Sequence, residues 1–85
     1  MTHEVPIEPE LDLHTFVPSE VGDIVDEYIT AAHAKGFHRV RLIHGRGTGV
    51  LRGVVQARLE RHPLVAGFAD DTASHLGATF AELKS

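Results

Sequence analysis

The sequence predicts an α/β two-layer sandwich, in which both helices cover one face of a single β-sheet. Short runs that alternate apolar and polar residues, or that are dense in Val, Leu and Ile, indicate strands. Two longer runs with apolar residues at spacings of three and four indicate helices. In chain order the elements are β-α-β-α-β-β. Connections between parallel strands are right-handed. If both connections lead to the next strand in the same direction across the sheet, both helices lie on the same face. The other face of the sheet is expected to be open.

The size of the chain limits it to one domain. It has 85 residues, of which 42% are apolar and 24% are charged, which leaves no length for a second core. It has no cysteine, and this excludes disulfides, thiolate zinc sites and cysteine nucleophiles. No apolar run reaches the roughly 18 to 20 residues that cross a bilayer, and the acidic start does not resemble a signal peptide. These features predict a cytoplasmic protein without a membrane anchor.

A loose segment is expected before the first strand. Residues 1–10 are polar and acidic and contain two prolines, so they are predicted to form a flexible acidic lead-in. The domain itself is predicted to cover residues 11–85. Leu11–His14 alternates apolar and polar side chains, which predicts a short strand with Asp12 and His14 on the open face. They would lie near the carboxyl end of that strand, where parallel sheets bind ligands.

The remaining elements follow from apolar stripes and from residues that stop a helix. The first helix is predicted to begin at Pro18 and to end near Lys35, with Gly36 as its cap. Its stripe consists of Val21, Ile24, Val25, Tyr28, Ile29 and Ala32. The second helix is predicted to follow a glycine-rich turn and to end at His62-Pro63. Its stripe consists of Val50, Leu51, Val54, Val55 and Leu59. The other strands are predicted at residues 37–44, 64–70 and 78–83.

Positive charge is concentrated in the middle third of the chain. The formal net charge of -4 argues by itself against a nucleic-acid partner. However, residues 1–34 carry -8, residues 35–62 carry +6 and residues 63–85 carry -2. The cations of the middle segment are Lys35, Arg39, Arg41, Arg46, Arg52, Arg58 and Arg61. This segment predicts a cationic surface suited to phosphate, although arginines on a strand and a helix also form ordinary solvated faces.

His44–Gly49 is a glycine-rich segment between the second strand and the second helix. Its three glycines allow a tight turn and a close approach of a ligand to the backbone, and the helix N-terminus adds unpaired N–H groups. Arg46 and Arg52 could bind the same phosphate. The segment lacks the Gly-Lys-Ser/Thr ending of a Walker A loop. A purely structural turn is the alternative interpretation.

His14 and His44 each end a predicted strand. If these strands are neighbours, both imidazoles lie at one edge of the sheet, an arrangement that suits acid–base cleavage of a phosphodiester. Asp12 could orient an imidazole or hold a metal ion. Asp12 and His14 alone are too small a ligand set to predict a Mg²⁺ or Mn²⁺ site. The alternative is that these residues have structural roles only.

Three segments resemble the motifs of the Smr (small MutS-related) domain family. Leu11–His14 resembles its LDLH motif, His44–Gly47 its HGxG motif and Gly77–Thr79 its terminal GAT motif. The resemblance covers nearly the whole chain. It implies a fold similar to the C-terminal domain of bacterial translation initiation factor 3. That fold has a four-stranded mixed sheet of order 1-2-4-3 with an antiparallel last strand.

The resemblance also implies a function, because Smr domains are associated with the nicking or cleavage of DNA or RNA. The residues that match its motifs and would act in catalysis are Asp12, His14 and His44. With the cationic segment included, the expected nucleic-acid-binding residues are Lys35, Arg41, Gly45, Arg46, Gly47, Thr48, Gly49 and Arg52. The sequence departs from the family at Thr15, Ser74 and His75, where members usually have glycine. The last two changes are expected to stiffen the final loop and to alter substrate access.

The sequence therefore predicts an endonuclease that acts on DNA or RNA, with or without Mg²⁺ or Mn²⁺. The first alternative is a nucleic-acid-binding or ribosome-binding module without catalysis. A second alternative is a protein-interaction module that uses the acidic side of the first helix. Many Smr domains are attached to larger partners, so self-association or a protein partner is compatible with each hypothesis.

Overall fold

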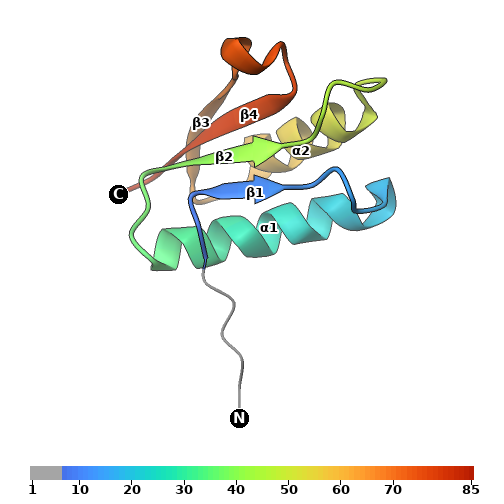
Figure 1. The fold of residues 1–85 in the computed structure, drawn as a ribbon. Coiled ribbons are helices and arrows are strands. Elements are labelled where there is room, and N and C mark those ends of the chain that lie inside the picture. The colour runs from blue at the N-terminus through green and yellow to red at the C-terminus, as the bar shows by residue number, and fades with distance from the viewer. Residues whose placement is uncertain (1–6) are drawn as a thin grey trace.

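The computed structural model describes residues 7–85 and has the predicted order of elements (Figure 1). The strands are β1 (Glu10–Asp12), β2 (Arg39–Ile43), β3 (Val65–Asp70) and β4 (Ala78–Leu83). The helices are α1 (Pro18–Ala34) and α2 (Val50–Arg61). A short 3-10 helix, Thr72–Ser74, lies between β3 and β4 and was not predicted. The ends of the predicted strands and helices are otherwise within two residues of the observed ones.

The sheet is mixed, as the resemblance implies, and its strand order is β1-β2-β4-β3. β1 pairs with β2 in parallel, and β4 pairs in antiparallel fashion with β2 and β3. Leu11 lies opposite Leu42, and Asp12 lies opposite Ile43. This register decides which side chains of β1 and β2 share a face of the sheet.

The core lies between the sheet and the two helices, which pack against each other. The aliphatic side chains that are at most 1% exposed and at least as large as valine are Leu13, Val21, Val25, Ile29, Val40, Leu42, Val55 and Leu59. They come from the predicted stripes of both helices and from the inward positions of the strands. Val50, at the first position of α2, departs from its predicted stripe and is 54% exposed. Within residues 7–85, neither helix combines the length and the apolar character needed to cross a bilayer.

The segment directly before β1 makes hydrogen bonds to β2 and α1. The carbonyl of Pro9 accepts the backbone N–H of Arg41 at 2.8 Å, so the pairing with β2 begins before the predicted strand. A proline is acceptable there because β1 is an edge strand. Pro9 accepts a hydrogen bond through its carbonyl and needs no backbone N–H to donate one. The Tyr28 hydroxyl donates to the carbonyl of Glu8 and ties the same segment to α1. The first six residues of the predicted lead-in lie outside the described residues.

Tyr28 is the only tyrosine of the chain, so its ionisation can be followed by ultraviolet absorbance. Burial, with smaller contributions from the charges of Glu10 and Glu8, raises the pKa of Tyr28 to about 12. We therefore expect the phenol to titrate near pH 12 in the folded protein and near pH 10 in the unfolded protein. Because the folded-state pKa is the higher one, the stability linked to the neutral phenol is complete below pH 10 and is lost as the pH rises through 12.

The control for this titration is Tyr28→Phe, which keeps the ring in the core but has no ionisable group. It supplies the absorbance baseline and should lose the steep fall in stability at high pH. A phenol that titrates near pH 10 while circular dichroism still shows the native fold would contradict the burial of Tyr28.

Candidate functional site

Three segments that the sequence singled out meet at one edge of the sheet. β1 and β2 are parallel neighbours, so the residues that follow them, His14 and the segment His44–Gly49, lie at the same edge. The connection between β3 and β4 reaches this edge as well. There the carbonyl of Gly77 accepts the N–H groups of His44 at 3.1 Å and of Gly45 at 2.9 Å. The three motifs are thus neighbours in space.

The two histidines lie on opposite faces of the sheet. Since Asp12 is opposite Ile43, the next position pairs Leu13 with His44. Successive side chains alternate between faces, so His44 shares the buried face with Leu13, and His14 shares the open face with Asp12. Burial agrees with this, because His44 is 3% exposed whereas the side chain of His14 is 62% exposed. This register does not bring the two imidazoles together as one acid–base pair.

Asp12 and His14 form an exposed hydrogen-bonded pair. Nδ1 of His14 bonds to Oδ1 of Asp12, and the same oxygen accepts the backbone N–H of His14 at 3.0 Å. The hydrogen bond from the imidazole, followed by the one from the backbone, lowers the pKa of the Asp12 carboxyl. With the proton on Nδ1, the lone pair of Nε2 points away from Asp12, and no polar group within residues 7–85 bonds to it. The pair therefore presents to solvent a nitrogen that can take up a proton.

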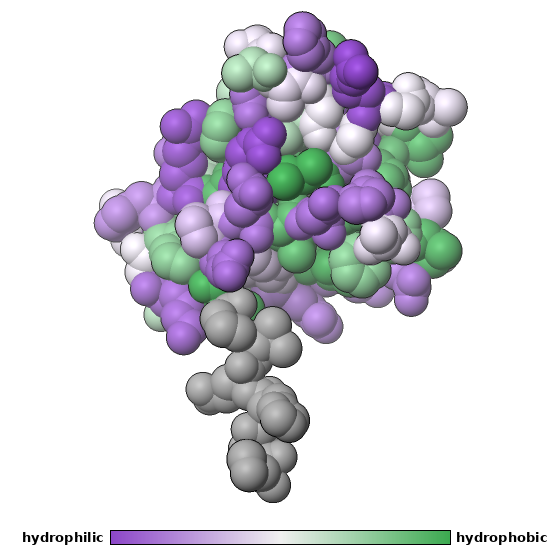
Figure 2. Space-filling model, viewed as in Figure 1, coloured by the Kyte–Doolittle hydropathy of each residue, from purple (hydrophilic) through white to green (hydrophobic). Residues whose placement is uncertain are grey.

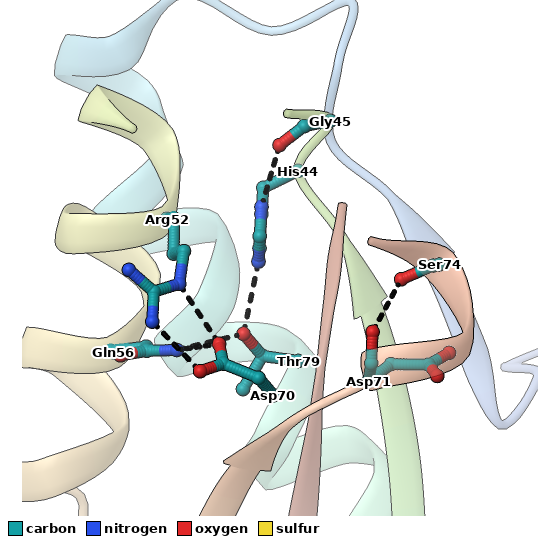
Figure 3. A network of polar contacts seen from close by, with 8 residues as sticks. All are labelled: His44, Gly45, Arg52, Gln56, Asp70, Asp71, Ser74 and Thr79. Carbon is teal, nitrogen blue, oxygen red and sulfur yellow. Dashed lines mark hydrogen bonds and ion pairs between the residues drawn. The ribbon is translucent and has the colours of Figure 1, made fainter. Parts of the chain in front are cut away.

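His44, in contrast, is held at both ring nitrogens (Figure 3). Nδ1 lies 2.9 Å from the carbonyl oxygen of Gly45, which can only accept, so Nδ1 carries the proton. Nε2 lies 2.9 Å from the hydroxyl of Thr79, which donates to it. The fold thus fixes one tautomer of neutral His44 and leaves neither nitrogen free for a substrate.

A chain of polar side chains supports Thr79 in turn. The amide of Gln56 donates to the Thr79 hydroxyl at 3.2 Å and to Oδ1 of Asp70 at 2.8 Å. Arg52 binds Asp70 with two hydrogen bonds of 2.8 and 2.7 Å. The hydrogen bond from Arg52 is the largest cause of the lowered pKa of Asp70. This network joins α2, β3 and β4 to the end of β2 and positions His44 (Figure 3).

The glycine-rich segment lines a cavity of about 310 Å³, together with Pro18 and the first turn of α2. Gly45, Gly47 and Gly49 all have positive φ angles, which glycine adopts without strain. Gly49 is the N-cap of α2, and no side chain caps the first turn. The N–H groups of this turn are therefore available to an anion such as phosphate.

Four of the seven cations of the predicted cationic surface form ion pairs with carboxylates of the same chain. The ion pairs are Arg39 with Glu82, Arg41 with Glu10 and Asp71, Arg52 with Asp70, and Arg58 with Asp23 and Asp26. Two of the residues predicted to bind nucleic acid, Arg41 and Arg52, are among them. These arginines connect strands and helices to one another. Their charge is already balanced by carboxylates, so less of it is available to phosphate than the sequence predicted.

Arg46 is the cation that remains at the site. Of the carboxylates in the described part of the chain, none lies within ion-pair distance of it. Its side chain passes close to Gly77, where a Cβ atom would lie 3.4 Å from Cγ of Arg46. Lys35, in contrast, follows the end of α1, at the opposite end of the sheet from the glycine-rich segment (Figure 1). Lys35 is therefore not part of this site.

Sequence reasoning missed the role of Gln56 and of Asp70 in positioning His44. Thr79 was singled out only as the last residue of a motif, and that motif was the one available signal for the network. Hydrogen-bond partners that lie on three different elements leave no local pattern in the sequence. In residues 7–85, no three His, Asp or Glu side chains form a group that could hold a metal ion.

A family model for the Smr domain matches residues 11–84. The chain belongs to the Smr domain family. The Smr domain of Thermus thermophilus MutS2 is 35% identical, with a TM-score of 0.83 over 89% of this chain and 98% of that chain. YdaL, a stand-alone small MutS-related protein from Escherichia coli, is 25% identical, with a TM-score of 0.84 over 94% of this chain and 67% of that chain. These similarities confirm the predicted fold of this Smr domain.

Curated relatives of this Smr domain include larger proteins named endonuclease MutS2. The protein from Staphylococcus carnosus is 36% identical over 85 residues, which is 98% of this chain and 11% of that protein. The protein from Caldicellulosiruptor saccharolyticus is 45% identical over 62 residues, which is 71% of this chain and 8% of that protein. This Smr domain thus matches about a tenth of the length of these relatives.

Thr79→Val tests the network around His44, because it removes a hydroxyl and preserves the shape of a fully buried side chain. It leaves Nε2 of His44 without a partner and removes one of the two acceptors of the Gln56 amide, which keeps its hydrogen bond to Asp70. We expect the free energy of unfolding to fall by about 1–3 kcal/mol, and His44 to populate a mixture of tautomers. Urea unfolding measures the first effect, and the ¹⁵N chemical shifts of the imidazole measure the second.

Thr30→Val is the matched control, because it removes an exposed hydroxyl on α1 that bonds only to a backbone carbonyl. It should change neither the stability nor the His44 tautomer to a comparable degree. Thr79→Ser, which retains the hydroxyl, should restore the tautomer. If Thr79→Val keeps both the parental stability and the parental imidazole shifts, the network does not position His44.

Proposed function

We propose that this Smr domain is an endonuclease that cleaves phosphodiester bonds of DNA or RNA. The observation that carries the proposal is the exposed Asp12–His14 pair, at the same edge of the sheet as the cavity of the glycine-rich segment. Cleavage of a phosphodiester needs a group that moves a proton beside donors that stabilise charge on the phosphate. The relatives named endonuclease MutS2 support the same class of reaction.

His14 is the proposed acid–base group. Its Nε2 takes the proton from the attacking oxygen, which belongs to water or, in RNA, to a 2′-hydroxyl, as that oxygen bonds to phosphorus. The leaving oxygen departs with the electron pair of its bond to phosphorus and is protonated by solvent. Asp12 accepts the hydrogen bond from Nδ1, so it orients the ring and stabilises the imidazolium that forms. A divalent cation would find one protein ligand here, the carboxylate of Asp12, and would need phosphate oxygens and water for the rest, because Nε2 of His14 points away from Asp12.

The phosphate is proposed to bind in the cavity at the start of α2. The uncapped N–H groups of the first turn and the backbone of residues 46–49 supply donors that are fixed before the substrate arrives. Arg46 supplies a full positive charge from the same segment. Donors that are already in place stabilise the charge that develops on the phosphate oxygens without reorganisation.

His44 is assigned a positioning role in place of the acid–base role that the sequence suggested. Its Nδ1–H binds the carbonyl of Gly45, and its backbone N–H binds the carbonyl of Gly77. These contacts hold the first residue of the glycine-rich segment against the connection between β3 and β4. His44 therefore acts on the phosphate site through the backbone of the segment.

The burial of His44 also favours a second candidate function, a nucleic-acid-binding or ribosome-binding module without catalysis. A mechanism with two histidines needs a general acid as well as a general base, and of His14 and His44 only His14 has a nitrogen that is open to solvent. This module would use the same cavity and Arg46. It would bind the same substrates and leave them intact.

The test incubates the purified protein with labelled single-stranded RNA and with supercoiled DNA, each in Mg²⁺, in Mn²⁺ and in EDTA. We expect cleavage of at least one substrate. His14→Ala should slow it by about 10²- to 10⁴-fold, because general acid–base catalysis contributes that much. Asp12→Asn should slow it as well, and Arg46→Ala should weaken substrate binding.

His38→Ala is the matched control, because His38 is an exposed histidine before β2, at the end of the sheet away from the site. It should cleave at the parental rate. Cleavage of RNA in EDTA favours the 2′-hydroxyl as the nucleophile, whereas cleavage that requires Mg²⁺ or Mn²⁺ indicates a metal-assisted reaction, for which Asp12 is the candidate ligand. Binding without cleavage in every condition would replace the endonuclease with the binding module.

A further inference from the structure

Large apolar side chains are exposed around this site. In the described part of the chain, five large apolar residues are at least 36% exposed. They are Phe16, Val17, Val50, Phe68 and Leu76. All except Phe68, which lies on β3, are within three residues of a motif that forms the site. We call Phe16, Val17, Val50 and Leu76 the apolar rim.

The fold brings the apolar rim to the edge of the sheet that holds the cavity. Pro18, which directly follows Phe16 and Val17 in the chain, lines the same cavity as Val50. Leu76 directly precedes Gly77, whose carbonyl binds the glycine-rich segment. Figure 2 shows hydrophobic surface on the right of the molecule, at the end where α1 and α2 begin in Figure 1. The rim therefore borders the proposed phosphate site.

Leu76 is held in a backbone conformation that is unfavourable for leucine. Its φ is 67°, and that of the preceding His75 is 53°, so both residues are left-handed. They form the centre of a tight turn that closes where the N–H of Gly77 donates to the carbonyl of Ser74 at 3.1 Å. Such strain is usually offset by packing, but Leu76 is 46% exposed. A strained and exposed leucine next to Gly77, which binds the segment that lines the cavity, indicates a role in binding.

We infer that the apolar rim holds unpaired nucleobases, so that the substrate is single-stranded nucleic acid. This inference rests on the proposed function, because it places the phosphate in the neighbouring cavity. Every base has a flat apolar face that stacks on aromatic side chains, whatever the sequence. In a duplex these faces are covered by neighbouring base pairs, so only an unpaired base can rest against Phe16.

The polar groups beside the apolar rim favour a nucleic acid over a second copy of this chain. Within residues 7–85, Arg46 has no carboxylate partner and the first turn of α2 has no side-chain cap. A single strand supplies phosphate for these donors and bases for the rim at the same time. A second copy that packed its own apolar rim here would bury the donors without acceptors, which is unfavourable.

The test measures fluorescence anisotropy in a His14→Ala background, which prevents cleavage. The probes are a labelled single strand, the matching duplex and an abasic strand that keeps the phosphates but lacks the bases, each made as RNA and as DNA. We expect the single strand to bind more tightly than the other two. Phe16→Ala should weaken single-strand binding by about 5- to 150-fold, which corresponds to the loss of one stacked base. It should leave binding of the abasic strand unchanged, because no base is there to stack.

Phe68→Ala is the matched control, because Phe16 and Phe68 are 38% and 36% exposed and only Phe16 belongs to the apolar rim. It should bind all three probes as the parent does. Leu76→Gly separates binding from folding, since glycine fits the left-handed turn better than leucine. We expect this variant to melt at the parental temperature or above it and yet to bind the single strand more weakly.

The outcomes distinguish this inference from the proposed function. If the parent binds duplex as tightly as single strand, or if Phe16→Ala behaves like Phe68→Ala, the inference is wrong and the proposed function stands. If sedimentation shows a dimer that Phe16→Ala dissociates, a second copy occupies the rim and the inference is wrong. If the parent binds none of the probes at low salt, the proposed function fails and the inference fails with it.

Discussion

The register between β1 and β2 is the constraint on which the site depends. Because Asp12 is opposite Ile43, the two histidine motifs are offset by one residue, and His44 enters the core while His14 stays in solvent. A slip of one residue in β2 would turn Leu42 toward the open face, so the apolar side chains of that strand enforce the register. Two histidines at equivalent ends of neighbouring strands thereby receive different chemistry. One can exchange a proton with a substrate, and the other holds the backbone.

Burial of His44 obliges the fold to satisfy both of its ring nitrogens, because an unpaired buried polar group costs about 1–3 kcal/mol. Gly45 and Thr79 do so, and Gln56 extends the network to the carboxylate of Asp70. Among the described residues, no buried side-chain polar atom lacks a partner. The helix α2 contributes Gln56 to this network, and its first turn forms part of the cavity. The contacts that satisfy the buried imidazole thus also fix the helix that would receive the phosphate.

Periodicity in the sequence was sufficient to predict the elements and the layers, because the apolar stripe of α1 and the alternation at Leu11 and Leu13 report burial directly. It also predicted the edge of the sheet where the motifs meet. Alternation along β1 also placed Asp12 and His14 on the open face. It could not predict that His44 takes the opposite face from His14, since this depends on the register between two strands that are far apart in the chain. Nor could it predict ion pairs. Arg52 was expected to bind phosphate, yet its two donors meet Asp70, 18 residues away, where α2 packs beside β3.

The internal ion pairs change what can hold a nucleic acid on this domain. The electrostatic part of such binding grows with the number of phosphates that are neutralised, and four of the arginines are already paired with carboxylates. For the proposed function, we therefore expect affinity to come from contacts that do not depend on net charge, such as backbone N–H groups and stacked bases, or from a larger chain that carries the domain. In the MutS2 relatives the matching segment is about a tenth of the protein. For the proposed function, weak electrostatic affinity would suit such an arrangement, because the domain would then act only on a strand that the rest of a larger chain holds in place.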